Sequence, residues 1–153
     1  MTQLLTQIDA RLGRSSFFQH RICATLPGGG ECELKGNSLK SLGSFALGDD
    51  LYEFDCDALY RNKILQVNHN YCAGVMGVGE YLSIYSSSDE YLYALRPSEK
   101  SISSSFILSN KETKLCEITR SYFGMRFTAH VSEALPTEIA LLCLWVAMTK
   151  MSG

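Results

Sequence analysis

The amino-acid sequence predicts one mainly antiparallel β domain that ends in a buried hydrophobic helix. Between residues 17 and 131, short segments rich in β-branched and aromatic residues alternate with glycine, serine, asparagine and acidic residues, at the spacing of hairpins. The run Ile139 to Met148 then leaves no polar stripe, and a helix that is apolar on all sides must be covered on all sides. We therefore expect a β barrel or a strongly curled sheet around this helix.

The composition fits a single globular domain over residues 1–153. The chain is 46% hydrophobic and 20% charged, which is too apolar for a disordered protein. Fourteen basic and sixteen acidic residues give a net charge of -2 and a pI near 5.9, so no global field attracts nucleic acid. We expect no nucleic-acid partner and no cofactor.

Turn residues such as Pro27 to Gly30 and Gly48 to Asp50 separate the expected strands. Within a strand, Phe106 and Leu108 alternate with Ile107, the period of two that gives a sheet one core face. The strands are expected at residues 17–26, 30–35, 39–47, 51–55, 59–67, 81–85, 91–96, 105–109, 114–122 and 126–131.

Helices are expected at both ends of the chain. Residues 2–14 place Leu4, Leu5, Ile8 and Leu12 on one stripe, which predicts a short amphipathic helix. The C-terminal helix is expected at 137–151, with Thr137 as its cap and Glu138 favourable at the positive end of its dipole. Its apolar run is half of the roughly 20 residues that cross a bilayer, so we expect no transmembrane segment.

The six cysteines predict a reducing compartment. Their spacing is irregular and we expect no signal peptide, so we expect a cytoplasmic protein. Some lie in apolar patterns, where a thiol acts as a small buried hydrophobe. The cysteines are Cys23, Cys32, Cys56, Cys72, Cys116 and Cys143.

One stretch of the chain resembles a known superfamily. Over residues 91–151, "SSFILSNKETKLCEITRSYFGMRFTAHVSE" followed by "LPTEIALLCLWVAMTKM" is similar to the strand, turn, strand units and central helix of the tubby C-terminal superfamily, which includes phospholipid scramblases and LURP-one-related proteins. The segment "LYEFDCDALYRNKILQVNH" resembles another such unit. The resemblance implies a β barrel threaded by its C-terminal helix, and binding of membrane lipid or phosphoinositide head groups without catalysis.

A site for such head groups needs several basic side chains on one face, because charge-assisted bonds must offset the lost hydration of phosphate. Our candidates are Arg61, Lys63, Arg120 and Arg126. The alternative is that these residues simply form a solvated surface. The other basic residues considered are Arg96, Lys100, Lys111 and Lys114.

The sequence evidence for a metal site or a reactive cysteine is weaker. The pairs His20/Cys23 and His69/Cys72 have the right number of ligands for zinc. Residues three apart in a strand point to opposite faces, so only His69 and Cys72, in an expected loop, remain as weak metal candidates, and we expect no metal. Cys72 with His69 or His130 is also the pairing considered for a cysteine nucleophile.

Two further patterns have simpler structural interpretations. Asp55 and Asp57 resemble paired catalytic aspartates, but that chemistry follows a parallel strand in an α/β fold, and an acidic hairpin edge is the simpler interpretation. Gly74, Gly77 and Gly79 match no nucleotide-binding fingerprint, and we expect a flexible loop or a bulged strand there.

We therefore expect a noncatalytic binding module whose partner is an anionic lipid head group, at the periphery of a membrane. One alternative is a protein-interaction subunit or a small secretion-type chaperone, which would bind through the N-terminal helix or the tyrosine-rich strands. The other is an enzyme with a Cys/His site. The tyrosines concerned are Tyr81, Tyr85, Tyr91 and Tyr93.

Overall fold

The computed structural model describes residues 6–13, 19–37, 42–55, 62–68, 70–78, 81–86, 91–97, 105–110, 113–120 and 126–152. These residues form twelve strands followed by one helix. The elements are β1 Thr6–Leu12, β2 Gln19–Thr25, β3 Glu31–Asn37, β4 Leu42–Leu47, β5 Asp50–Asp55, β6 Asn62–Val67, β7 Asn70–Val78, β8 Tyr81–Ser86, β9 Tyr91–Pro97, β10 Ser105–Asn110, β11 Thr113–Arg120, β12 Arg126–Val131 and α1 Thr137–Ser152.

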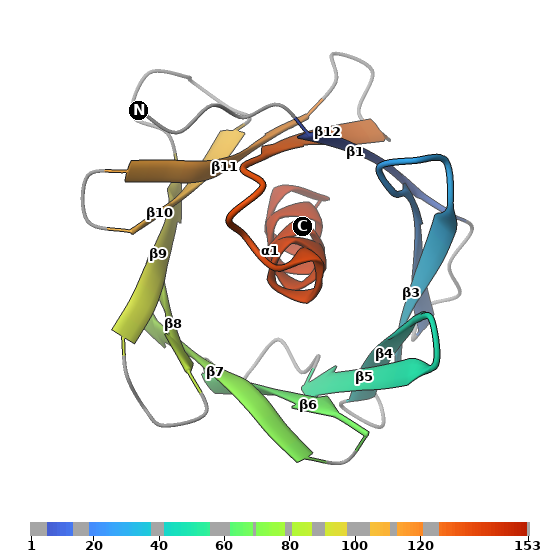
Figure 1. The fold of residues 1–153 in the computed structure, drawn as a ribbon, viewed down its shortest axis with the longest axis horizontal. Coiled ribbons are helices and arrows are strands. Elements are labelled where there is room, and N and C mark those ends of the chain that lie inside the picture. The colour runs from blue at the N-terminus through green and yellow to red at the C-terminus, as the bar shows by residue number, and fades with distance from the viewer. Residues whose placement is uncertain are drawn as a thin grey trace.

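The strands form a closed antiparallel barrel. Each strand pairs with its neighbours along the chain, and β1 pairs with β12 as well as with β2. Figure 1 shows the barrel in cross-section, with α1 inside it. Because every described strand has a neighbour on both sides, this part of the chain offers no free edge to an additional strand.

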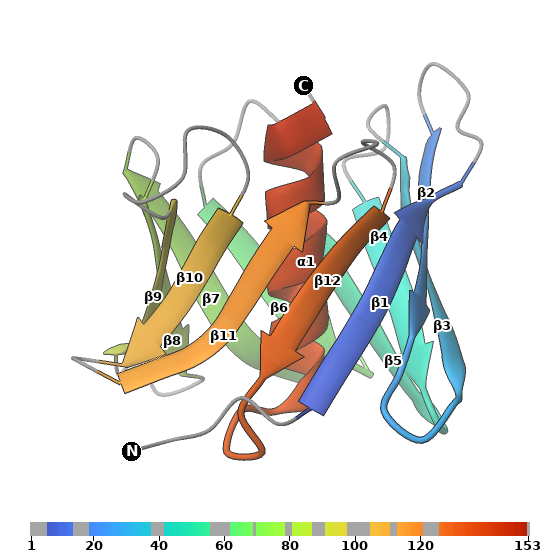
Figure 2. The same cartoon turned by 90° about the horizontal axis from the view of Figure 1, so that it is seen from above.

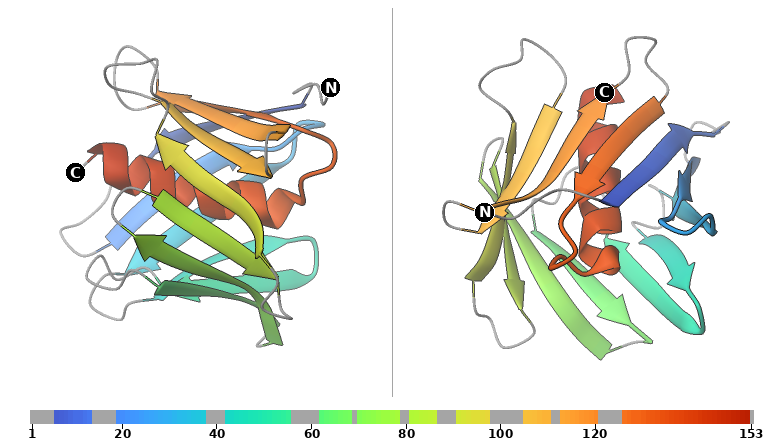
Figure 3. Two further views of the ribbon diagram at one scale, coloured as in Figure 1. Left: turned by 90° about the vertical axis from the view of Figure 1, so that its left-hand side faces the viewer. Right: turned by 45° about the horizontal axis from the view of Figure 1, so that its top comes forward.

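The helix runs along the inside of the barrel from one rim to the other (Figures 2 and 3). No residue from Ala140 to Ala147 is more than 2% exposed. Complete burial of a large apolar side chain stabilises a fold by about 1.5–3 kcal/mol, so this helix is a major part of the core. None of the helical segments in the described residues has the length and apolar character that a membrane crossing requires.

The residue that caps the helix lies one position earlier than expected. The carbonyl oxygen of Pro136 accepts hydrogen bonds from the backbone N–H groups of Ile139 and Ala140, both at 3.2 Å. The residue whose carbonyl accepts the first helical bonds is the N-cap. Pro136 therefore caps α1, and Thr137 is its first helical residue.

The predicted antiparallel β fold with a C-terminal helix is confirmed, but the predicted N-terminal helix is wrong. Residues 6–12 form β1. Ile8 and Ala10 are buried, whereas Asp9 and Arg11 are exposed, a period of two. Leu4 and Leu5 of the expected stripe lie outside the described residues. This segment pairs with β12 over residues 6–11 and with β2 over residues 9–12, and the backbone hydrogen bonds of these two ladders outweigh its helical stripe.

A second strand was also missed. Residues 70–78 form β7, paired with β6 and β8, where a loop around Cys72 and a flexible loop or a bulged strand around the glycines were expected. The register of β6 and β7 shifts between Leu65 and Gln66, so an irregularity is present on this ladder. Gly74 and Gly77 lie within the strand, and glycine weakens the sequence signal of a strand because it has no side chain to alternate.

Two glycines of the wall leave room for large aromatic side chains of the core. Gly36 and Gly43 are direct partners on β3 and β4. A Cβ atom on Gly36 would collide with the ring of Trp145, and one on Gly43 would collide with the ring of Phe54. These two rings meet edge to face, with centroids 5.3 Å apart, a favourable aromatic geometry. The glycine pair therefore makes the space that Trp145 and Phe54 fill.

We predict that Gly36→Ala destabilises the protein by about 1–3 kcal/mol, because the added methyl group overpacks the core against Trp145. Trp145→Phe removes the part of the ring that meets residue 36. The double variant should therefore lose less free energy of unfolding than the sum of the losses in the two single variants, and the difference should be about 0.5–3 kcal/mol. Urea unfolding of the four proteins measures this coupling.

The matched control for this cycle is Gly30→Ala. A Cβ atom on Gly30 would meet no atom within 4 Å, so this variant should unfold like the wild type. A Gly36→Ala variant that is also as stable as the wild type would contradict the proposed packing.

Candidate functional site

Charged residues are sorted between the two rims of the barrel. We call the rim at which α1 ends the basic rim, and the rim at which it begins the acidic rim (Figure 2). Among described residues in the first two or last two positions of a strand or in the last turn of α1, the basic rim holds Arg11, Lys63, Arg96, Arg120, Arg126 and Lys150, against Asp55. In the corresponding strand ends, turns and first helical turn, the acidic rim holds Glu31, Asp49, Asp50, Glu133 and Glu138, against Lys114.

Two arginines lie directly opposite each other on the basic rim. Arg11 of β1 and Arg126 of β12 are register partners, and both are exposed. Like charges in this arrangement repel each other. Neither arginine has an ion pair or hydrogen bond with another described residue. Closure of the barrel thus creates an exposed pair of arginines, and no described residue forms an ion pair with either of them.

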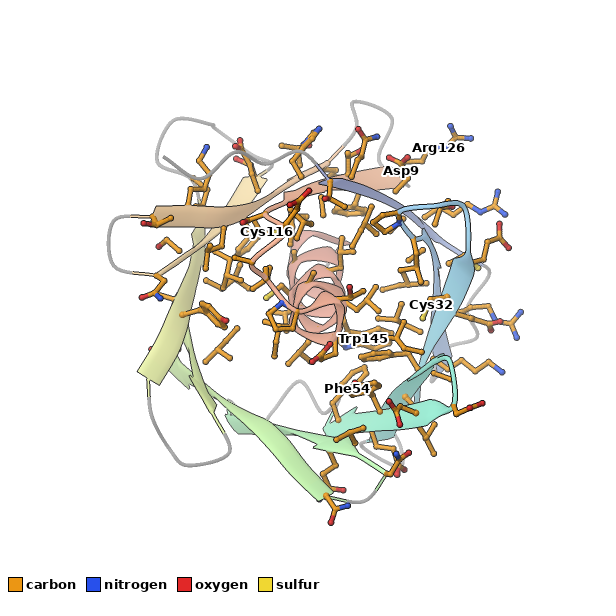
Figure 4. All side chains as sticks on the ribbon, in the orientation of Figure 1. Asp9, Cys32, Phe54, Cys116, Arg126 and Trp145 are labelled. Carbon is orange, nitrogen blue, oxygen red and sulfur yellow. The ribbon has the colours of Figure 1, made fainter. Side chains whose placement is uncertain are left out.

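Asp9 is a carboxylate on the same outer face that already accepts hydrogen bonds. Asp9 lies two residues before Arg11 and is the register partner of Thr128. Its Oδ1 accepts hydrogen bonds from Gln7 Nε2 at 3.0 Å and from Thr128 Oγ1 at 3.3 Å. Figure 4 places Asp9 and Arg126 together on the outside of the wall. The carboxylate therefore lowers the local positive potential but does not form an ion pair with either arginine.

Other basic side chains on the outer wall are paired. Arg21 Nε lies 2.6 Å from Glu33 Oε1, and Lys114 Nζ lies 2.7 Å from Glu117 Oε2. Unlike Arg11 and Arg126, these cations must lose their existing partners before they can bind an external anion. The arginine pair is therefore the best-supported anion site in the described residues.

The structure separates the basic residues that the sequence suggested. Arg120 is the register partner of Phe127, which is only 1% exposed. Cross-strand partners share a face, so Arg120 lies on the inner face of the wall and Arg126 on its outer face. Lys63 is in β6, across the barrel from β12 (Figure 1). Arg61 lies outside the described residues.

Arg11 was missed because its segment was expected to be helical. In "IDARL", from Ile8 to Leu12, apolar and polar residues alternate strictly, and this alternation was the signal of a strand. Its pairing with Arg126 could not be found from that signal alone, because it depends on the first strand meeting the last.

The weak metal and nucleophile candidates gain no support. Cys72 lies in β7 rather than in a loop, and His69 is outside the described residues. His20 and Cys23 lie three apart in β2, where regular alternation directs side chains to opposite faces. Among the described side chains, no group of three or more His, Cys, Asp or Glu residues could hold a metal ion.

Three described cysteines are poor nucleophiles. Burial raises the pKa of Cys116 to about 12 and raises that of Cys143 well above its usual value. The pKa of Cys32 is also raised, mainly by burial, although its Sγ donates a 3.4 Å hydrogen bond to the carbonyl of Ala46. Because the thiolate is the reactive form, these thiols are protonated and unreactive near neutral pH.

One tyrosine of the suggested binding strands belongs to the core instead. Tyr93 is partly buried and packs against the core cluster. Its pKa is raised, first by burial and then by the nearby Cys143 and Glu138. Of Tyr81, Tyr85 and Tyr91 the structure describes only the backbone. A tyrosine-lined groove therefore has no support from Tyr93.

The expected acidic hairpin edge is divided between the rims, with Asp49 and Asp50 at the acidic rim and Asp55 at the basic rim. Asp49 and Asp50 are exposed at the β4–β5 turn. Asn68 connects this turn to the β6–β7 turn: its Nδ2 donates to Asp50 Oδ1 and its Oδ1 accepts from Leu51 N, both at 2.9 Å. Asn68 has φ of 50°, a left-handed conformation that asparagine tolerates well. Asp57 lies outside the described residues.

Comparison of the chain with protein-family models, curated proteins and solved structures finds no match. Function must therefore be argued from the chain's own geometry. The described surface offers a pair of exposed arginines and two oppositely charged rims, whereas its buried thiols offer no nucleophile. This arrangement can bind anions.

We predict that Cys32, Cys116 and Cys143 resist alkylation by iodoacetamide in the native protein, because their raised pKa values and burial suppress the thiolate. The same residues should react fully in denaturant. Peptide mass spectrometry after alkylation at pH 8 measures the modification of each cysteine. Rapid native modification of Cys116 or Cys143 would contradict the burial of these thiols.

Proposed function

We propose that this protein is a noncatalytic binding module that docks on anionic membrane surfaces through its basic rim and recognises lipid head groups there. The observation that carries the proposal is the register pair of Arg11 and Arg126, exposed on the outer wall and unpaired among the described residues. A head-group phosphate between the two guanidinium groups would replace repulsion with two charge-assisted interactions.

Arginine suits this role because its guanidinium group presents several donors in a planar fork that matches phosphate oxygens. Basic residues near an anionic membrane contribute about 1 kcal/mol each. The basic positions at this rim lie at strand ends around the barrel and in the last turn of α1. Such a distribution favours contact of the whole rim with a charged surface, with Arg11 and Arg126 as its best-defined point.

The resemblance to the tubby C-terminal superfamily adds support. The architecture that it implies is a β barrel threaded by a C-terminal helix, which agrees with an antiparallel barrel around α1. Lipid head-group binding is the activity that the resemblance implies. A fold hosts many functions, however, so the proposal depends first on the arginine pair and only second on the architecture.

The alternative of a secretion-type chaperone loses its suggested binding surface. That surface was an amphipathic N-terminal helix, but residues 6–12 form a barrel strand and Ile8 is buried in the core. The enzyme alternative depended on Cys72 with His69 or His130, but Cys72 lies in strand β7 rather than in a loop, and His69 lies outside the described residues. Membrane-surface binding is therefore the better-supported function.

We predict that Arg11→Ala with Arg126→Ala weakens binding to phosphoinositide-containing liposomes by at least about tenfold, since each basic residue contributes about 1 kcal/mol at an anionic surface. Binding of the wild type should also weaken as salt rises, because salt screens exposed charges. Cosedimentation at two salt concentrations, with and without phosphoinositide, measures both effects.

The matched control is Arg21→Ala with Lys114→Ala, which removes the same two positive charges from ion-paired positions. This control should retain most of the binding. Equal losses in the two double variants would show that only net charge matters, and an absence of liposome binding by the wild type would reject the proposed function.

A further inference from the structure

The described residues of the two rims are oppositely charged, although the whole chain is almost neutral. The described elements place six basic residues against one acidic residue at the basic rim, and five acidic residues against one basic residue at the acidic rim, while the net charge of the chain is only -2. Charge is thus separated along the barrel axis. The two ends of one molecule are electrostatically complementary to each other.

The acidic rim also has charges available for a partner. Asp49 and Glu133 are exposed, and neither has an ion pair or hydrogen bond with another described residue. Asp49 belongs to the β4–β5 turn, and Glu133 lies between β12 and α1. Among the described residues, the acidic rim therefore offers two exposed, unpaired carboxylates, as the basic rim offers the two exposed, unpaired guanidinium groups of Arg11 and Arg126.

The barrel wall is less suited to self-association than its ends. The described strands have no free edge for pairing with another copy. Among the side chains that the structure describes, Leu51 is the only exposed large hydrophobic one, at 41%, and it lies beside Asp50 at the acidic rim. These side chains therefore supply no apolar patch for a symmetric side-by-side dimer.

We propose that copies of this chain associate head to tail, with the basic rim of one copy against the acidic rim of the next. Such a contact uses different surfaces on its two sides, and it continues into a stack when the rotation between copies does not close a ring. It is electrostatic, so it requires low ionic strength and high protein concentration. It does not depend on lipid binding.

Head-to-tail contact and membrane docking would use the same basic rim. A copy docked on an anionic surface keeps its acidic rim free, and that rim can accept the basic rim of a second copy. A copy within a stack has its basic rim covered. Membrane binding therefore limits stacking to the side of the barrel that faces away from the lipid.

The test is sedimentation velocity of the purified protein at low ionic strength, about 0.01 M, and at about 1 M, where the Debye length falls from roughly 30 Å to 3 Å. The wild type should show a concentration-dependent increase in mass at low salt and only the 17.0 kDa monomer at high salt. A wild type that stays monomeric at low salt up to its solubility limit would overturn the proposal.

Complementary charge reversals test the pairing of rims. The acidic-rim variant, Asp49→Lys with Glu133→Lys, and the basic-rim variant, Arg11→Glu with Arg126→Glu, should each be monomeric, because the substitutions cancel nearly all of the net charge of the altered rim. Mixed in equal amounts at low salt, they should form a dimer of twice the 17.0 kDa monomer mass and nothing longer, because each variant retains one intact rim. Association of either variant alone, or no association in the mixture, would overturn the proposal.

Folding and lipid binding are checked separately. Circular dichroism confirms that both variants retain the β fold. The acidic-rim variant should bind liposomes like the wild type, because its basic rim is intact. Failure of the mixing experiment with normal liposome binding would reject stacking and leave the proposed membrane function standing.

Discussion

The need to cover α1 on every side is the constraint from which the rest of the structure follows. A helix with no polar stripe cannot lie on the surface of a flat sheet, because one of its faces would remain in water. The closed barrel solves this by surrounding the helix, with Ala140 to Ala147 almost completely buried. Gly36 and Gly43 then make room for Trp145 and Phe54 on one side. Closure, glycine positions and aromatic packing are thus consequences of one apolar helix.

The same constraint directs function to the ends of the barrel. The interior is filled by the helix and its neighbours, and the described wall has no free strand edge. Polar and charged groups are therefore available on the outer face and at the rims. Closure also joins the first strand to the last, which places Arg11 opposite Arg126. The arginine pair is in this sense a product of the fold rather than of any local motif.

The sequence predicted the parts of the fold whose signals are local. The apolar run from Ile139 to Met148 predicted a buried helix, and the alternation of residues around Phe106 predicted a strand. Residues 6–12 were misassigned because Leu4, Leu5, Ile8 and Leu12 also fit a helical period, and β7 was missed because its glycines obscure alternation. The candidate site was predictable only in part: Arg126 was named, but its partner Arg11 comes from the opposite end of the chain, and such long-range register has no local signature.

The most direct test of the central claim uses Trp145, the single tryptophan of the chain. Its side chain lies between α1 and the barrel wall and is only 2% exposed. Acrylamide quenching of tryptophan fluorescence in the native protein should therefore be weak, with a blue-shifted emission, and both should change together with the far-ultraviolet circular dichroism in one unfolding transition. Strong quenching in the native state, or exposure of Trp145 before the β signal is lost, would show that the barrel does not enclose the helix and would contradict the account.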